Sequence, residues 1–122
     1  TQLMCGSEGT LGVITKIVFK LRGYPQKTVL MMIPFVTNEE ACKAIAAIFV
    51  AGINPSGCEF FEAEAAAKTY EYCIKVLNSP ITTRLTEGMG SYLLCELDGN
   101  DEEVLIRDAE RVMSVVEKFN SG

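Results

Sequence analysis

Every second residue from 11 to 21 is apolar except Thr15, so these side chains share one face, while Ile14 and Val18 lie on the other face with Lys16 and Lys20. A period of two is typical of a strand, so we predict a strand over residues 11–21. Residues 23–25, Gly-Tyr-Pro, end it because glycine and proline favour turns. Residues 28–36 are apolar on both faces and predict a second, central strand with Pro34 near its end.

The rest of the chain predicts helices separated by shorter strands. Residues 37–40, Thr-Asn-Glu-Glu, form a capping box in which Thr37 caps a helix and Glu40 reaches back to it. That helix ends at Gly52. The remaining elements are, in chain order, a strand at 58–61, a helix at 62–77, a loop at 78–90, a strand at 91–97, and a helix capped by residues 99–101 and stopped by residues 120–122.

This order predicts an α+β fold of the ferredoxin-like kind. Few strands and amphipathic helices favour an open antiparallel sheet with helices on one face, preceded by a glycine-rich loop and the strand at 11–21. A boundary is expected near residue 24. Residues 1–24 form one part, and residues 25–122 form a self-sufficient module.

Charge and composition narrow the classes of function. The 122 residues carry a net charge of −5, which argues against nucleic acid as a partner because phosphate binding needs a cationic surface. Glu59, Glu62 and Glu64 flank a predicted helix start, where solvated carboxylates are favoured by the helix dipole, so we do not assign them catalysis. The first residue is Thr1 and the sequence opens inside a motif, so we expect a piece of a longer protein.

Histidine is absent and the five cysteines do not form close pairs. A Ser/His or Cys/His nucleophile is therefore excluded within this chain, and no zinc or iron–sulfur spacing is present. The sequence predicts no catalytic residue and no metal ligand. The cysteines have apolar neighbours, so we expect small buried side chains, a reducing compartment and a cytoplasmic location.

One glycine-rich string carries candidate chemistry: Gly6-Ser7-Glu8-Gly9-Thr10-Leu11-Gly12-Val13-Ile14-Thr15. Three glycines let the backbone approach a ligand closely, and exposed N–H groups in such a turn can bind an anion. On spacing alone, a plain turn before a strand is the commoner explanation. The string is not a strand-to-helix dinucleotide fingerprint, because a strand is expected after it.

This string resembles the segment that closes the FAD-binding domain of FAD-linked oxidases and dehydrogenases of the vanillyl-alcohol oxidase type, such as glycolate oxidase and D-lactate dehydrogenase. Residues 25–122 are similar, more loosely, to the start of the C-terminal cap domain of the same family, with Ala-Gly-Ile-Asn-Pro at residues 51–55 and Glu-Phe-Phe-Glu at residues 59–62. The resemblance implies FAD contact, largely through backbone, at Glu8, Gly9, Thr10, Leu11, Gly12, Val13 and Ile14.

The resemblance implies a parent flavoprotein that oxidises a small 2-hydroxy acid with FAD, and it allows an iron–sulfur or other electron-acceptor subunit as a partner. The family's main FAD domain would lie upstream and its His-rich motif downstream, so this chain alone is expected to be inactive. A stand-alone ferredoxin-like module that binds a ligand or a partner is the competing hypothesis. The strand expected at residues 11–21 would leave an open edge, which predicts a homo-oligomer of the chain by itself.

Overall fold

The computed structural model describes residues 2–78 and 85–119. Six elements follow one another: β1 (Lys27–Phe35), α1 (Asn38–Val50), β2 (Gly57–Glu62), α2 (Ala63–Lys75), β3 (Ser91–Gly99) and α3 (Glu102–Val116). Each matches an element expected from the sequence. Of the loop predicted at 78–90, residues 79–84 lie outside the described residues, as does the stop predicted at residues 120–122.

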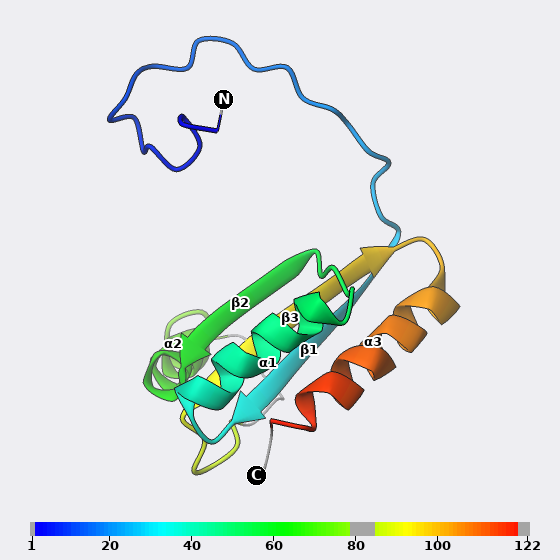
Figure 1. Cartoon of the computed structure of the whole chain (residues 1–122). Helices are drawn as coiled ribbons and strands as arrows, with labels where there is room; N and C mark the ends of the chain where they lie inside the picture. Colours follow the sequence, from blue (N-terminus) through cyan, green and yellow to red (C-terminus); the bar gives the residue numbers. More distant parts are fainter. Residues whose placement is uncertain (1, 79–84, 120–122) are drawn as a thin grey trace.

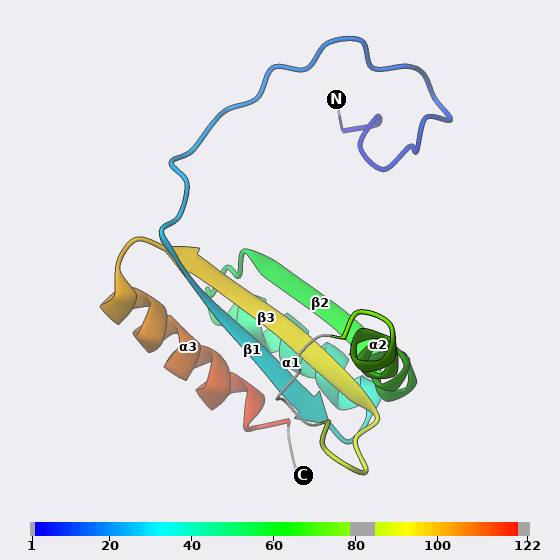
Figure 2. The same cartoon turned by 180° about the vertical axis from the view of Figure 1, so that it is seen from behind.

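The three strands form one antiparallel sheet in the order β1-β3-β2. Since β1 and β2 both run antiparallel to β3, they are parallel to each other and α1 is the crossover between them, as in a split βαβ unit. Helices α1 and α3 cover one face of the sheet (Figure 1). Helix α2 follows β2 and lies at the end of the opposite face (Figure 2). The predicted α+β ferredoxin-like fold is confirmed. The prediction that the helices share one face holds for α1 and α3 but is wrong for α2, which packs on the face of Met32 and Tyr92.

The core lies between the sheet and the helices α1 and α3. Alternate residues of β1 and β3 point into it, because successive side chains of a strand face opposite sides. The helices contribute small or branched side chains at helical spacing. The buried residues of this cluster are Ile33, Phe35, Ala41, Ala44, Ile48, Ile53, Leu93, Cys95, Leu97, Leu105, Val112 and Val116.

The central position predicted for β1 is wrong, because β3 is the central strand and β1 lies at an edge. Apolar residues on both faces of β1 suggested burial on both sides. In the structure only the face of Ile33 and Phe35 is buried, while Leu30 on the other face is exposed. Pro34 suits an edge position, because proline has no N–H to give to a neighbouring strand.

The strand predicted over residues 11–21 is also wrong. These residues have no regular secondary structure, and their apolar side chains are exposed. They form the extended trace that leads away from the sheet in Figure 1. The alternation is real, but a strand needs a neighbour to complete its hydrogen bonds, and none of the described strands lies beside this segment.

Burial of the cysteines was predicted correctly for Cys95 and wrongly for Cys5 and Cys42, which are exposed. Cys42 follows the buried Ala41 on α1 but points to the outer side of the helix. Apolar sequence neighbours therefore did not indicate burial, because consecutive helix positions face different directions.

Candidate functional site

The glycine-rich string folds into two consecutive turns. The N–H of Ser7 donates to the carbonyl of Met4 at 3.3 Å, and the N–H of Thr10 donates to the carbonyl of Ser7 at 2.9 Å. The hydroxyl of Thr10 donates to the same Ser7 carbonyl at 2.6 Å. The side chain of Thr10 thereby fixes the second turn.

Left-handed backbone conformations shape these turns. Gly6 has φ +77°, Glu8 has φ +50° and Gly9 has φ +80°. Glycine adopts such values without steric cost, whereas a residue with a Cβ pays for them. A Cβ added at Gly9 would meet no atom within 4 Å, and one at Gly12 would meet only the Cε of Met4 at 3.5 Å. The backbone therefore lies bare on one side of the segment.

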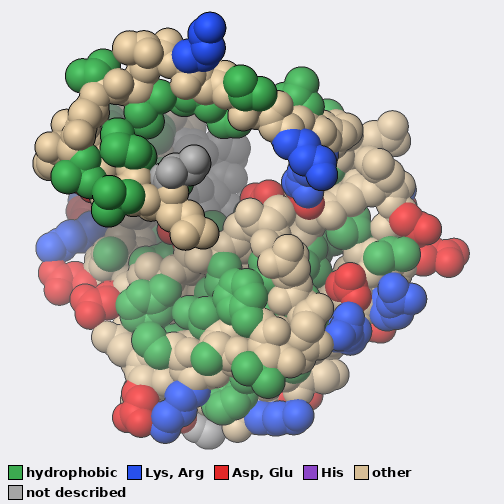
Figure 3. All heavy atoms as spheres, turned by 45° about the horizontal axis from the view of Figure 1, so that its top comes forward, with side chains coloured by type: hydrophobic (Ala, Val, Ile, Leu, Met, Phe, Trp, Pro, Cys, Tyr) green, Lys and Arg blue, Asp and Glu red, His purple; other side chains and the backbone are tan. Residues whose placement is uncertain are grey.

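All seven residues expected to contact FAD are exposed, from Glu8 to Ile14. The N-terminal segment forms the arc at the top of Figure 3, with hydrophobic and polar surface along it. These residues form one continuous exposed stretch. The described contacts between the N-terminal segment and the sheet are made further along the chain, by Arg22 and Gln26. The segment presents backbone and apolar side chains on an open surface.

Two residues that the sequence did not single out tie this segment to the sheet. The guanidinium of Arg22 forms an ion pair with Asp98 of β3. The N–H of Gln26 donates to the Oδ1 of Asn100 at 3.0 Å. A pairing across more than seventy residues leaves no local sequence signal, so only the fold could reveal it.

The exposed turns fit one side of a flavin site. Bare N–H groups and glycines allow a planar or anionic group to approach the backbone. A complete cofactor site surrounds most of its ligand, and in the described part of the chain Ile14 shares a hollow with Met4, Cys5 and residues 16–19 of the same segment. Residues 8–14 would hold FAD through backbone contacts, with further walls supplied by other parts of a longer protein.

The acidic residues near α2 have structural roles. Glu62 accepts a hydrogen bond from the Nδ2 of Asn38 at 3.1 Å, and Glu64 pairs with Lys68 at 2.7 Å on the solvent side of the helix.

Among the described residues, no group of three or more His, Cys, Asp or Glu side chains is placed to hold a metal ion. Nor does any described helix have the length and apolar character to cross a membrane.

Tyr92 is a core residue on the face that α2 covers. Its ring stacks on Phe61 with centroids 5.9 Å apart, and its hydroxyl donates to the carbonyl of Thr86 at 3.0 Å. Met32, Ala66, Tyr70 and Cys73 lie around the same end of the sheet in a small apolar pocket. This pocket has no charged lining residue, so it fits packing better than recognition of a carboxylate.

Comparison with known proteins identifies the family. Residues 24–122 match the family described as FAD linked oxidases, C-terminal domain. The chain belongs to this family. FAD is the cofactor of these FAD-linked oxidases, and the resemblance seen in the sequence is confirmed.

Curated relatives of this FAD-linked oxidase chain are much longer than it. A D-lactate dehydrogenase of Anaerostipes hadrus is 34% identical over 116 residues, which are 93% of this chain and 24% of the relative. The glycolate oxidase subunit GlcD of Escherichia coli K12 is 32% identical over 95% of this chain and 21% of the relative. The mitochondrial D-lactate dehydrogenase [cytochrome] of Arabidopsis thaliana is 30% identical over 100% of this chain and 19% of the relative. The chain thus spans about a fifth to a quarter of these relatives.

Proposed function

We propose that this chain is part of a flavoprotein oxidoreductase that oxidises a small 2-hydroxy acid with FAD. The observation that carries the proposal is the match of the whole chain, glycine-rich string included, to a D-lactate dehydrogenase. Lactate and glycolate, which the relatives' names give, are both small 2-hydroxy acids. Bound FAD would accept the hydride from the alcohol carbon of such a substrate.

In this proposal residues 8–14 lie against FAD, and residues 25–122 are the first part of a cap domain. The positive φ at Gly9 turns the backbone, and Thr10 holds the turn through its bond to Ser7. Arg22 and Gln26 fix the distance between this segment and the sheet through Asp98 and Asn100. The described residues offer an orienting surface, and the catalytic residues would lie elsewhere in the longer protein.

An electron-acceptor partner belongs to the same proposal. The GlcD relative is named as a subunit, and the name of the Arabidopsis relative includes a cytochrome. A flavin reduced by substrate must pass its electrons on before the next turnover. An iron–sulfur or other electron-acceptor subunit would take them.

Gly12→Val in the full-length flavoprotein tests the assigned surface. A branched side chain would stand where the backbone meets the cofactor, so we expect substantially less FAD per mole of purified protein. Gly9→Val should act in the same direction, with added strain because Gly9 has φ +80°. Gly12 is the sharper site, since no positive φ accompanies it. The measurement is the flavin released on denaturation.

Gly23→Val is the matched control, because a Cβ at Gly23 meets no atom within 4 Å and the residue lies outside the contact stretch. This variant should retain its flavin. Full flavin content in Gly12→Val would sink the assignment of the segment.

Mixing the intact protein anaerobically with glycolate or D-lactate tests the substrate class separately, because oxidation of either acid bleaches the flavin. Retained colour with both acids would overturn that part of the proposal.

A further inference from the structure

Two of the five cysteines, distant in the sequence, are direct neighbours in the sheet. Cys58 of β2 is the register partner of Cys95 of β3. Because partners on adjacent strands project their side chains to the same face, both thiols lie on the core side of the sheet. Cys95 is fully buried there, and Cys58 packs against the same cluster at partial burial. Both are free thiols in this structure.

The hydrogen bonds of the ladder place these two cysteines at the closer of the two antiparallel spacings. The N–H of Ala63 donates to the carbonyl of Gly90 at 2.9 Å, in the same register that joins Cys58 to Cys95. In an antiparallel ladder, pairs that exchange backbone hydrogen bonds alternate with pairs that exchange none. Cys58 lies an odd number of positions from Ala63, so it belongs to a pair of the second kind.

The direction of a neighbouring carbonyl supports this assignment. The carbonyl of Glu96 points toward β2, because it accepts from the N–H of Ser56 at 2.8 Å. The backbone groups of the adjacent Cys95 therefore point toward β1. Partners without hydrogen bonds between them have Cα atoms about 4.5 Å apart, and disulfides span Cα separations of about 4.4–6.8 Å. The backbone needs little movement to admit an S–S bond here.

The two thiols also affect each other electrostatically. Burial and, second to it, the charge of Cys58 raise the pKa of the Cys95 thiol to about 11. A charge acts on a thiol in this way at short range. Burial and the charge of Glu59 raise the pKa of Cys58. Both thiols therefore keep their protons at neutral pH, so they react slowly and only with an oxidant in excess.

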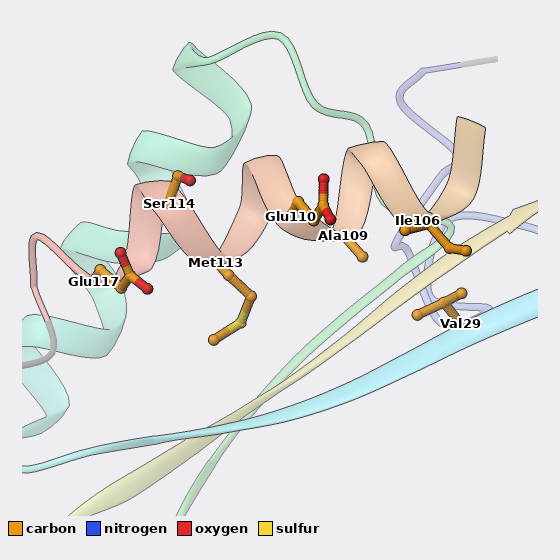
Figure 4. A pocket seen from close by; sticks show the side chains of 7 residues that line it. All are labelled: Val29, Ile106, Ala109, Glu110, Met113, Ser114 and Glu117. Atoms are coloured by element: carbon orange, nitrogen blue, oxygen red, sulfur yellow. The ribbon is translucent and has the colours of Figure 1, made fainter. Parts of the chain in front are cut away.

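Helices cover the face on which the two thiols lie. Helix α1 lies in front of the sheet in Figure 1, and Cys95 belongs to the same buried cluster as Ile48 of α1. On the side of β1, Figure 4 shows Ala109 and Met113 of α3 directed toward Val29, which packs against that cluster. The contact between the two cysteines is thus internal to the fold and does not depend on which residues precede or follow this chain.

The other three cysteines have different places. Cys5 lies in the N-terminal segment and Cys42 on the outer side of α1, and both are exposed. Cys73 of α2 lines the small apolar pocket together with Phe61. Because side chains alternate along a strand, Phe61 and this pocket lie on the opposite face from Cys58. The register of the sheet therefore selects Cys58 and Cys95 from the five.

We propose that Cys58 and Cys95 form a dithiol site, which a small disulfide such as oxidised glutathione converts to a cross-strand disulfide. Cys95 is fully buried, so the thiolate of Cys58 attacks first, forms a mixed disulfide and releases one glutathione thiol. The thiolate of Cys95 then attacks the sulfur of Cys58 and releases the second. The two cysteines lose two electrons and two protons, which the two released thiols carry away.

The new bond joins β2 to the central strand of the sheet. Helix α2 begins at Ala63, directly after β2 ends at Glu62, so the bond also limits movement at the start of that helix. Reductant reverses the reaction, because exchange with an excess of thiol runs in the opposite direction. This inference does not depend on the proposed flavin chemistry.

Peptide mapping of the full-length flavoprotein tests the site. The protein is equilibrated with oxidised glutathione, its free thiols are alkylated in urea, and a digest made without reductant is analysed by mass spectrometry. We expect a peptide pair joined through Cys58 and Cys95, at least about tenfold more abundant than any other disulfide within residues 1–122, because the fold holds the two thiols together. The same exchange carried out in urea should lose this preference.

Cys95→Ala removes the thiol that completes the exchange, so glutathione should stay attached to Cys58. Cys73→Ala is the matched control, because it makes the same change at a partly buried cysteine on the other face of the sheet. Its bridge should form as in the unaltered protein, whose mapping decides the question even if Cys95→Ala fails to fold. Lasting glutathione on Cys58 of the unaltered protein, a preferred bridge from Cys58 to any other cysteine, or no oxidation of Cys58 and Cys95 would overturn the proposal.

Discussion

At the scale of single residues, Gly90 lies directly before β3 and forms backbone hydrogen bonds to β1 and α2. Its N–H donates to Phe35 of β1 at 2.9 Å, and its carbonyl accepts from Ala63 of α2 at 2.9 Å. A Cβ built on it would lie 2.5 Å from the carbonyl oxygen of Val36. Gly90 is therefore needed for close approach of two backbones, since no positive φ is involved.

Gly90→Ala should lower the free energy of unfolding by about 1–3 kcal/mol, because the backbone of residue 36 or 90 must move to admit the methyl group. Urea denaturation of the 122-residue chain measures this. Gly23→Ala is the control, since a Cβ there meets no atom within 4 Å, and it should change stability by less than about 0.5 kcal/mol. Equal stability of the two variants would mean that the contact at Val36 relaxes without cost.

Thiol reactivity should divide the cysteines by environment. Burial raises the pKa of Cys95 to about 11, and burial also raises the pKa of Cys58. Thiolate is the reactive form, so at pH 8 an alkylating reagent should modify the exposed Cys5 and Cys42 first and Cys95 last. Mass spectrometry of peptides from a time course gives the order, and the same reaction in urea should label all five.

The raised pKa of Cys95 also makes the free energy of unfolding depend on pH. The folded Cys95 keeps its proton to higher pH than an unfolded thiol with a pKa near 9.0. Its contribution to stability is therefore complete below pH 9 and is lost as pH rises toward 11. Early labelling of Cys95 at pH 8 would contradict the assigned burial.

At the scale of elements, local signals succeeded wherever the determining contacts are local. The capping box formed as predicted, because Thr37 accepts from the N–H of Glu40 at 3.2 Å and the carboxylate of Glu40 accepts from the N–H of Thr37 at 3.2 Å. Asp101 caps α3 by accepting from the N–H groups of Glu103 and Val104. These caps join residues two or three apart, so the local sequence contains all the information they need.

The segment at residues 11–21 shows where local signals stop. The alternation of its side chains gives the segment two different faces. Whether it forms a strand depends on a neighbouring strand, which the local sequence does not specify. For the same reason β1 could not be placed at an edge from its own residues. The candidate site was predicted as a glycine-rich turn, and Gly9 has the left-handed φ that such a turn uses. The anchor from Arg22 to Asp98 could not be predicted, because it joins distant parts of the chain.

At the scale of the whole molecule, the sheet with its buried core differs from the exposed segment at residues 8–14. Residues 24–122, which match the C-terminal domain of FAD-linked oxidases, contain the sheet and its core. Residues 8–14 have no comparable burial, so their conformation rests on two turns and on the anchors further along. A surface of this kind gains order when a ligand or another protein segment covers it, and binding must offset the cost of that ordering.

Binding of FAD to the 122-residue chain alone should therefore be weak. One exposed stretch of backbone can cover only one side of a cofactor, whereas tight sites surround most of the ligand and are largely formed before it binds. Titration of FAD with the chain, followed by flavin fluorescence, should show no saturation at micromolar concentrations, while the full-length flavoprotein retains its cofactor. Gly12→Val should leave the titration of the short chain unchanged. A yellow 122-residue protein with micromolar affinity that Gly12→Val abolishes would show that residues 8–14 form most of the site.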